Sequence, residues 1–114
     1  MKLKLIPFHR TNIEDWTLAR NKDTSGEELA QLANRHDTAV RAAVAGHLHC
    51  LPPVMQQLVH DPEVRVRQAL AANPQCPPEV LVHLLADDHV MIRDLAILHP
   101  NMPEEYRTLH RSSS

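Results

Sequence analysis

Potential metal ligands are concentrated in one short stretch of the chain. The sequence contains nine histidines, and His47, His49 and Cys50 place three potential ligands within four residues. A structural zinc site normally needs four convergent ligands, and no CxxC or HxxxH pair supplies the others. The pattern therefore favours a structural role for the cluster and predicts no metal site and no cofactor, while the sequence alone leaves metal binding by these three side chains open.

The cysteines and the neighbouring carboxylates offer little for catalysis. No local signature marks Cys50 or Cys76 as a nucleophile, and both are predicted to be reduced core residues. Asp87-Asp88 and Glu104-Glu105 are carboxylate pairs, but adjacent residues on a helix point about 100° apart and do not converge. We therefore predict no catalytic residue and expect that the protein is not an enzyme.

Composition excludes several further classes. The chain has 114 residues and a net charge of −2, which argues against affinity built on many phosphate contacts. Only two glycines are present, so a glycine-rich phosphate loop is excluded. No apolar stretch reaches the length of a membrane span. We expect a cytoplasmic protein with no membrane association, present as a monomer or a weak dimer.

The sequence repeats itself with a fixed period. Cys50-Leu51-Pro52-Pro53-Val54 is followed 26 positions later by Cys76-Pro77-Pro78-Glu79-Val80, and segments 50–75 and 76–101 share eight identities. A period of this length indicates a repeat architecture. The predicted boundaries are an N-terminal arm at 1–8, a half-repeat at 9–23, full repeats at 24–49, 50–75 and 76–101, a terminal half-repeat at 102–111 and a disordered tail at 112–114.

Each repeat reads as two helices. Pro52-Pro53 suits a helix start because proline fixes φ and lacks the amide that is unpaired there. The chain then turns at Asp61-Pro62-Glu63, which opens a second helix with a capping carboxylate. Asn73-Pro74 ends that helix because the residue before proline avoids the α region. Helix pairs this small must stack to bury their apolar faces, so we predict an all-α solenoid of about four 26-residue repeats.

These motifs resemble a known family. CPPEVL at 76–81, the DP-x-V-R-x-R-x-A run from Asp61 to Ala69, and the Asn-Pro step before the next copy look like the leucine-rich repeat variant, within the wider class of HEAT-like α-solenoids. The resemblance covers roughly residues 9–111 and implies a right-handed superhelix with a short first helix in each repeat. The repeat at 24–49 departs most, with Ser25-Gly26 in place of the prolines.

Two columns of polar residues recur at the 26-residue step. The first is the arginine column: Arg41, Arg67 and Arg93. Asp61 and Asp87 precede the last two arginines by six residues. An anion-binding stripe is one interpretation, but a structural ladder that ties loop carbonyls and carboxylates together is favoured. Arg35 stands where the first full repeat needs its aspartate, so we expect the ladder to be weakest there. The second column is Asn21, His47, Asn73 and His99, and we expect it to satisfy backbone groups at a helix end.

A third set of positions varies most between repeats and is where a binding surface can be written. These columns space as i, i+3 and i+7 along the second helix. They contain Ile13, Trp16 and Arg20, then Ala39, Ala42 and Gly46, then Arg65, Gln68 and Ala72, and finally Met91, Asp94 and Leu98. Trp16 has the alternative role of capping the first core layer.

We predict a non-enzymatic protein–protein interaction module whose partner is another protein. The predicted binding residues are Trp16, Arg65, Gln68, Met91 and Asp94. The alternative is a nucleic-acid-binding HEAT-like module, supported only by Lys2, Lys4 and Arg10 near the N-terminus.

Overall fold

The structure, a computed structural model, describes residues 11–113 of the chain, with side chains up to residue 110. Within that range the regular elements are all helices, which confirms the predicted all-α class. In chain order they are α1 (Asn12–Arg20), α2 (Gly26–Leu32), α3 (Thr38–Ala45), α4 (Pro52–Leu58), α5 (Val64–Ala72), α6 (Pro78–Leu84), α7 (Val90–Leu98) and α8 (Glu104–Ser113). The predicted N-terminal arm at 1–8 lies outside the described residues.

The helices recur with the same period as the sequence. Helices α1, α3, α5 and α7 start at positions 12, 38, 64 and 90, and helices α2, α4, α6 and α8 start at 26, 52, 78 and 104. Each full repeat thus contains a helix of seven residues followed by one of eight or nine. Helix α8 departs from this scheme, because it runs for ten residues and continues to Ser113, past the predicted repeat end at 111.

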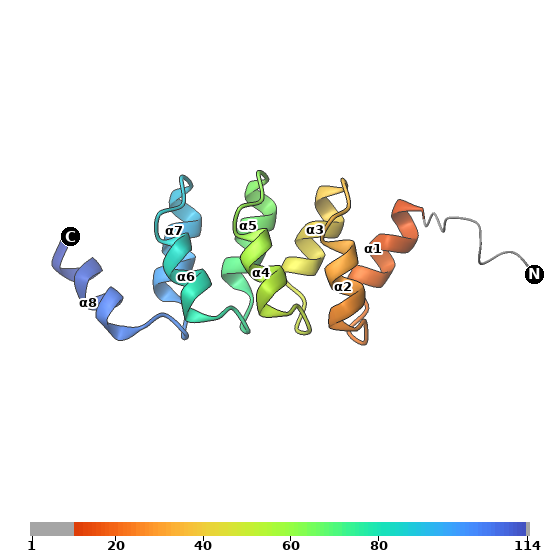
Figure 1. The fold of residues 1–114 in the computed structure, drawn as a ribbon. Coiled ribbons are helices and arrows are strands. Elements are labelled where there is room, and N and C mark those ends of the chain that lie inside the picture. The colour runs from red at the N-terminus through yellow and green to blue at the C-terminus, as the bar shows by residue number, and fades with distance from the viewer. Residues whose placement is uncertain (1–10, 114) are drawn as a thin grey trace, which may run out of the picture.

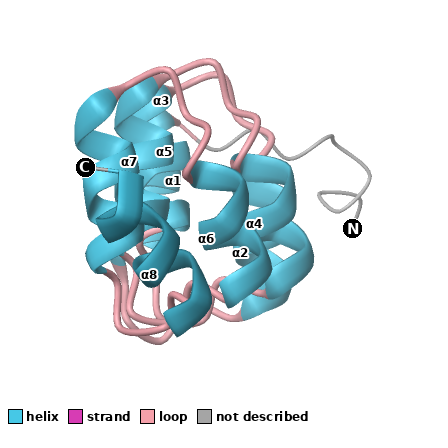
Figure 2. Ribbon diagram, turned by 90° about the vertical axis from the view of Figure 1, so that its left-hand side faces the viewer, coloured by secondary structure: helices cyan, strands magenta, loops and turns pink. Residues whose placement is uncertain are grey.

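The long and short helices form two layers. Figure 1 shows α3, α5 and α7 side by side along the molecule, with α1 at one end of their row and the short helices α2, α4 and α6 in a second row. The view along the stack in Figure 2 separates the two layers. Successive long helices pack on one another, α1 on α3, α3 on α5 and α5 on α7. The molecule is therefore an α-solenoid, and the right-handed sense of its superhelix stays a prediction.

The core lies between the layers and is aliphatic. Val40, Val66 and Ile92 hold the same position in successive long helices and are buried, and Leu32, Leu58 and Leu84 do the same in the short helices. These side chains are buried between the two layers and between successive repeats. Each repeat therefore depends on its neighbours for burial.

Local sequence sets where the helices start. Pro52 and Pro78 occupy the first positions of α4 and α6 as predicted. At α2 the side chain of Ser25 caps the helix instead. A Cβ atom on Gly26 would lie 2.8 Å from the Leu51 side chain, so glycine lets the next loop pack this closely. The departure from the proline pattern thus preserves the repeat register.

Candidate functional site

Ion pairs connect successive repeats at the loops that lead from each short helix into the next long one. Arg41 Nε donates to Asp61 Oδ2 at 2.8 Å and its Nη2 to Oδ1 at 3.2 Å. Arg67 binds Asp87 in the same two-bond manner at 2.7 and 3.2 Å. The two aspartate side chains are only 6% and 5% exposed. We call these pairs, together with Asp15–Arg35 described below, the ion-pair ladder.

Each arginine of the column also donates to a backbone carbonyl of its own repeat. Arg67 Nη1 donates to the carbonyl of Asp61 at 2.8 Å, and Arg93 Nη1 to that of Asp87 at 2.7 Å. The six-residue spacing seen in the sequence thus reflects a carbonyl contact, and the aspartate side chain binds the arginine of the preceding repeat. Asp61 is also not the helix cap that its position suggests, because α5 begins at Val64 with Glu63 as its N-cap.

The first pair of the ladder carries its charges in reverse order. Arg35 Nε donates to Asp15 Oδ2 at 2.9 Å. Asp15 stands one repeat step before Arg41, and Arg35 stands one repeat step before Asp61, so acid and base have exchanged places. The expectation that the ladder is weakest here rested on the missing aspartate, and it overlooked Asp15 as the acidic partner. The exchange is visible in the sequence only when both columns are extended into the first half-repeat together.

Electrostatics hold the Arg67–Asp87 pair in its charged state. Burial alone would raise the pKa of Asp87, but hydrogen bonds from Arg67 and from the His89 amide outweigh it and keep that pKa below its ordinary value. The hydrogen bond to Asp87 raises the pKa of Arg67 in turn, against the opposing effect of burial. Groups that stay charged through neutral pH suit a structural tie rather than proton transfer.

A second ladder runs along the loops at the opposite ends of the helices, and we call it the carbonyl ladder. His47 Nε2 lies 2.7 Å from the Asn21 carbonyl oxygen, and His99 Nε2 lies 2.8 Å from that of Asn73. Asn73 Nδ2 donates to the carbonyls of Ala45 and His47 at 2.8 and 3.0 Å. Each of these side chains thus reaches back into the preceding repeat.

The other polar atom of each side chain shapes the local turn. His47 Nδ1 accepts the amide of His49, and Asn73 Oδ1 accepts that of Gln75, two residues on in both cases. Because Nδ1 accepts, the proton of the neutral His47 ring is on Nε2, which donates to the carbonyl. At this column, asparagine and histidine therefore make the same two kinds of hydrogen bond: one to a carbonyl of the preceding repeat and one from the amide two residues on.

In the cluster of His47, His49 and Cys50, both histidine rings make hydrogen bonds to backbone atoms. His49 Nδ1 lies 3.1 Å from the Thr24 carbonyl oxygen, so a nitrogen of each ring is committed to the preceding repeat. Cys50 and Cys76 are free thiols and are buried. Burial raises the pKa of Cys50 to about 11 and that of Cys76 to about 12, which keeps both protonated and unreactive at neutral pH.

The variable positions lie together on the outer side of the long helices. We call this surface the variable face; it comprises Ile13, Trp16, Arg20, Ala39, Ala42, Gly46, Arg65, Gln68, Ala72, Met91, Asp94 and Leu98. None of these residues is buried. In the described part of the chain, four of the eight large apolar side chains that are exposed belong to it: Ile13, Trp16, Met91 and Leu98. Gln68 Nε2 donates to Met91 Sδ at 3.7 Å, so this surface is continuous from α5 to α7.

The variable face is hollowed where its residues are smallest. Ala42, Gly46 and Arg20 are among the residues that line a hollow of about 390 Å³ between α1 and α3. The guanidinium carbon of Arg20, which lines this hollow, lies 4.9 Å from the centre of the Trp16 ring and makes a cation–π contact with it. The sequence showed these columns as variable but gave no sign of the hollow.

No group of three or more His, Cys, Asp or Glu side chains among the described residues is placed to hold a metal ion. None of the described helices combines the length and apolar character needed to cross a membrane.

The packing and the 26-residue register define the class of protein: an all-helical repeat protein built as a solenoid. Within it, residues 64–89 match the family model described as leucine rich repeat variant. The resemblance predicted from the sequence is thereby confirmed for this segment, which contains the Arg67–Asp87 pair. The chain matches no curated protein and no solved structure.

Proposed function

We propose that this chain is a non-enzymatic interaction module that binds another protein through the variable face. The observation that carries the proposal is that the variable face exposes four large apolar side chains: Ile13 and Trp16 on α1, and Met91 and Leu98 on α7. Large apolar side chains that stay exposed beside polar residues are frequent at protein interaction sites. The predicted binding residues Trp16, Arg65, Gln68, Met91 and Asp94 all belong to that surface.

The two ends of the variable face offer different chemistry to a partner. Trp16 and Arg20 stand on α1 beside the hollow, and Met91 with Gln68 stands on the other side of it. Tryptophan, methionine and arginine are enriched where binding energy is concentrated. We infer that a partner side chain enters the hollow over α3 while the flanking residues contact its neighbours.

The composition of this surface favours a protein over nucleic acid. Arg20 and Arg65 are the basic residues of the variable face, and Asp94 opposes them. Affinity for a phosphate backbone grows with the number of phosphates neutralised, so two arginines beside an aspartate support only weak binding of that kind.

Site-specific photo-crosslinking tests the location of the surface. A photoreactive amino acid replaces Gln68 in one variant and Gln56 in another. Gln56 is an exposed glutamine on α4, in the short-helix layer, so the two variants differ in the face that they probe. Exposed to extract of the native host, the Gln68 variant is expected to give a discrete crosslinked protein, identified by mass spectrometry, and the Gln56 variant is not.

Replacing the predicted anchor residues with alanine then measures how much they contribute to the free energy of binding the partner identified by crosslinking. The double variant Trp16→Ala/Met91→Ala should weaken binding by at least ~1–2 kcal/mol. Gly46→Leu should also weaken binding, because it fills the hollow. A Cβ at Gly46 meets its nearest atoms at ordinary distances of 3.7 and 3.9 Å, and thermal unfolding of the variant shows whether the rest of the leucine side chain is accommodated. Equal crosslinking from both glutamine positions, or full binding by these folded variants, would contradict the proposal.

A further inference from the structure

Two exposed histidines from neighbouring repeats lie against each other in the short-helix layer. His60 follows the C-terminal end of α4, and His83 lies in the last turn of α6. Their ring centroids are 4.8 Å apart and the ring planes meet at 85°. Both rings line a hollow of about 420 Å³, which three aspartates also border: Asp61, Asp87 and Asp88. Nothing in the variable face or in the ladders involves this pair.

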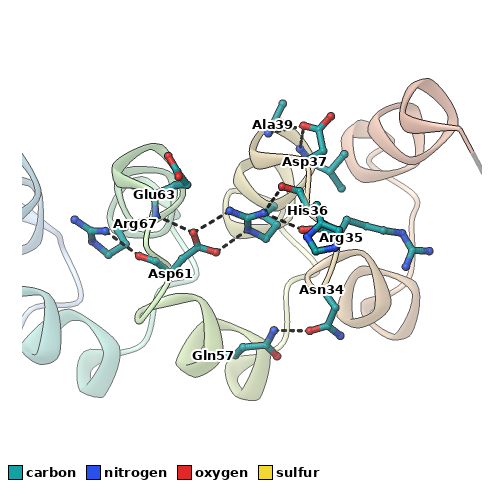
Figure 3. Close-up of polar contacts among 11 residues, drawn as sticks. Asn34, Arg35, His36, Asp37, Ala39, Gln57, Asp61, Glu63 and Arg67 are labelled. Atoms are coloured by element: carbon teal, nitrogen blue, oxygen red, sulfur yellow. Dashed lines mark hydrogen bonds and ion pairs between the residues drawn. The ribbon is translucent and has the colours of Figure 1, made fainter.

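The preceding repeat shows that the fold does not need histidine here. Moving both positions back by one repeat gives Asn34 and Gln57, and Gln57 Nε2 donates to Asn34 Oδ1 at 2.9 Å (Figure 3). An amide–amide hydrogen bond thus connects the short-helix layer at that step of the solenoid. At the next step two imidazoles occupy the same positions. An imidazole can coordinate a metal ion, and the contact between repeats does not require that capacity.

A second histidine pair in the molecule provides the contrast. The rings of His47 and His49 are 5.3 Å apart, but both make hydrogen bonds to backbone atoms. The ring nitrogens of His60 and His83 make no hydrogen bond to another residue in the part of the chain that the structure describes. Only the second pair therefore has its lone pairs available to a ligand from solution.

The separation of the rings suits one particular ligand. A metal ion lies ~2.0–2.1 Å from each coordinating nitrogen, so its distance to each ring centroid is ~3.2 Å. Two imidazoles on one ion at ligand angles between 90° and the tetrahedral value then have centroids ~4.5–5.2 Å apart. The observed 4.8 Å falls inside this range, and joint binding of one ion requires only that the two exposed rings turn until a nitrogen of each faces the same point.

We infer that His60 and His83 together bind one divalent transition-metal ion of the class that prefers imidazole: Cu²⁺, Ni²⁺ or Zn²⁺. The carboxylates of Asp61 and Asp87 accept hydrogen bonds from Arg41 and Arg67, so they add negative charge nearby rather than ligands. With two protein ligands, water completes the coordination. The site is therefore open and exchangeable, unlike a closed structural zinc site.

Binding at this position has a mechanical consequence. His60 belongs to the repeat at 50–75 and His83 to the repeat at 76–101, so one ion links the two. An ion that binds the folded state and not the unfolded chain raises the stability of the fold by mass action. This inference concerns the short-helix layer and is independent of the function proposed for the variable face.

The sequence itself supplies the matched variant. His60→Asn with His83→Gln recreates the Asn34–Gln57 pair one step further along, and it should leave the melting temperature without metal near that of the wild type. His36→Asn, at an exposed histidine away from the pair, controls for general binding by surface imidazole. Isothermal titration of each metal-free protein with CuCl₂, NiCl₂ or ZnCl₂ measures affinity, and thermal unfolding with and without the ion measures the linkage.

Wild type and His36→Asn should bind one ion at this site and melt higher in its presence, with Cu²⁺ tightest. The double variant should lose at least ~10-fold in affinity, since even loss of a second-shell contact commonly costs that much, and it should lose the metal-dependent rise in melting temperature. Added Cu²⁺ should broaden the amide NMR signals around residues 60 and 83 first. The inference is overturned if the double variant binds as tightly as wild type, or if broadening starts around His47 and His49.

Discussion

The two ladders join the same repeats at opposite ends of the helices, yet they use different chemistry. In the ion-pair ladder, a charged arginine lies over a nearly buried aspartate of the next repeat. In the carbonyl ladder, a neutral histidine or asparagine reaches back to a peptide carbonyl of the repeat before it. One edge of the solenoid therefore depends on paired charges, and the other depends on uncharged hydrogen bonds.

The arginine donors of the charged ladder are more exposed than the donors of the neutral ladder, although the acceptors are buried in both. Asn73 is completely buried, because a neutral amide with all its bonds made loses little on leaving water. The Arg41 side chain stays 13% exposed, and that of Arg35 in the reversed pair 39%, so part of each guanidinium remains hydrated. The carbonyl ladder keeps its hydrogen bonds whether histidine or asparagine stands at the position. The ion-pair ladder keeps an ion pair when the acidic and the basic residue exchange places.

The largest effect is expected from breaking a central ion pair. Arg67→Ala leaves the Asp87 carboxylate nearly buried without its cation and removes the donor to the Asp61 carbonyl. We expect a loss of about 2–4 kcal/mol in the free energy of unfolding, measured by urea denaturation. Arg65→Ala, on the exposed side of the same helix, should cost less than about 0.5 kcal/mol. Equal losses for the two would show that the ion-pair ladder is not an important tie.

A smaller effect should follow at the opposite edge. Asn73→Ala removes donors to the carbonyls of Ala45 and His47 and the acceptor for the Gln75 amide, and we expect a loss of about 1–3 kcal/mol. His99→Asn should cost less than about 1 kcal/mol, because asparagine performs both tasks one repeat earlier. If His99→Asn is as harmful as Asn73→Ala, the two side chains are not equivalent in this column.

Acid should weaken the ion-pair ladder in a way that one substitution isolates. The folded state lowers the pKa of Asp87 from its ordinary 3.8, so near and below that pH the unfolded chain binds the extra proton. The stability that this carboxylate contributes is present above pH 3.8 and is lost as pH falls through the lowered folded value. The difference in unfolding free energy between wild type and Asp87→Asn should therefore shrink as pH falls through 3.8 and below it. A constant difference would mean that the charge on Asp87 contributes nothing.

Much of this architecture was predictable from one sequence, for a physical reason. In a repeat protein the same local sequence signals occur several times. The 26-residue period, the prolines at helix starts and the buried columns therefore all support the same fold prediction. Pairing between repeats was harder to predict. The side chain of Asp61 has Arg67 close in sequence and Arg41 twenty residues earlier, and only the stacking of repeats decides that it binds Arg41.

The variable face was located by the same logic, but its shape was not. Sequence variation shows where the fold leaves residue choice free. It does not show that small side chains on α3 leave a hollow between larger neighbours, because that depends on the spacing between α1 and α3. The Asp15–Arg35 reversal was missed for a simpler reason: each column looked broken by itself, and only the two together keep an ion pair.

The smallest effect is expected from restoring the common charge order in the first pair. Asp15→Arg or Arg35→Asp alone places like charges together and should cost about 1–2 kcal/mol. The double variant Asp15→Arg/Arg35→Asp reproduces the order of Arg41–Asp61 and should recover to within about 1 kcal/mol of wild type. A double-mutant cycle measured by urea denaturation gives the coupling between the two positions directly. If the double variant is no more stable than the worse single variant, the surroundings of α1, rather than the pairing of opposite charges, determine which residue stands at each position.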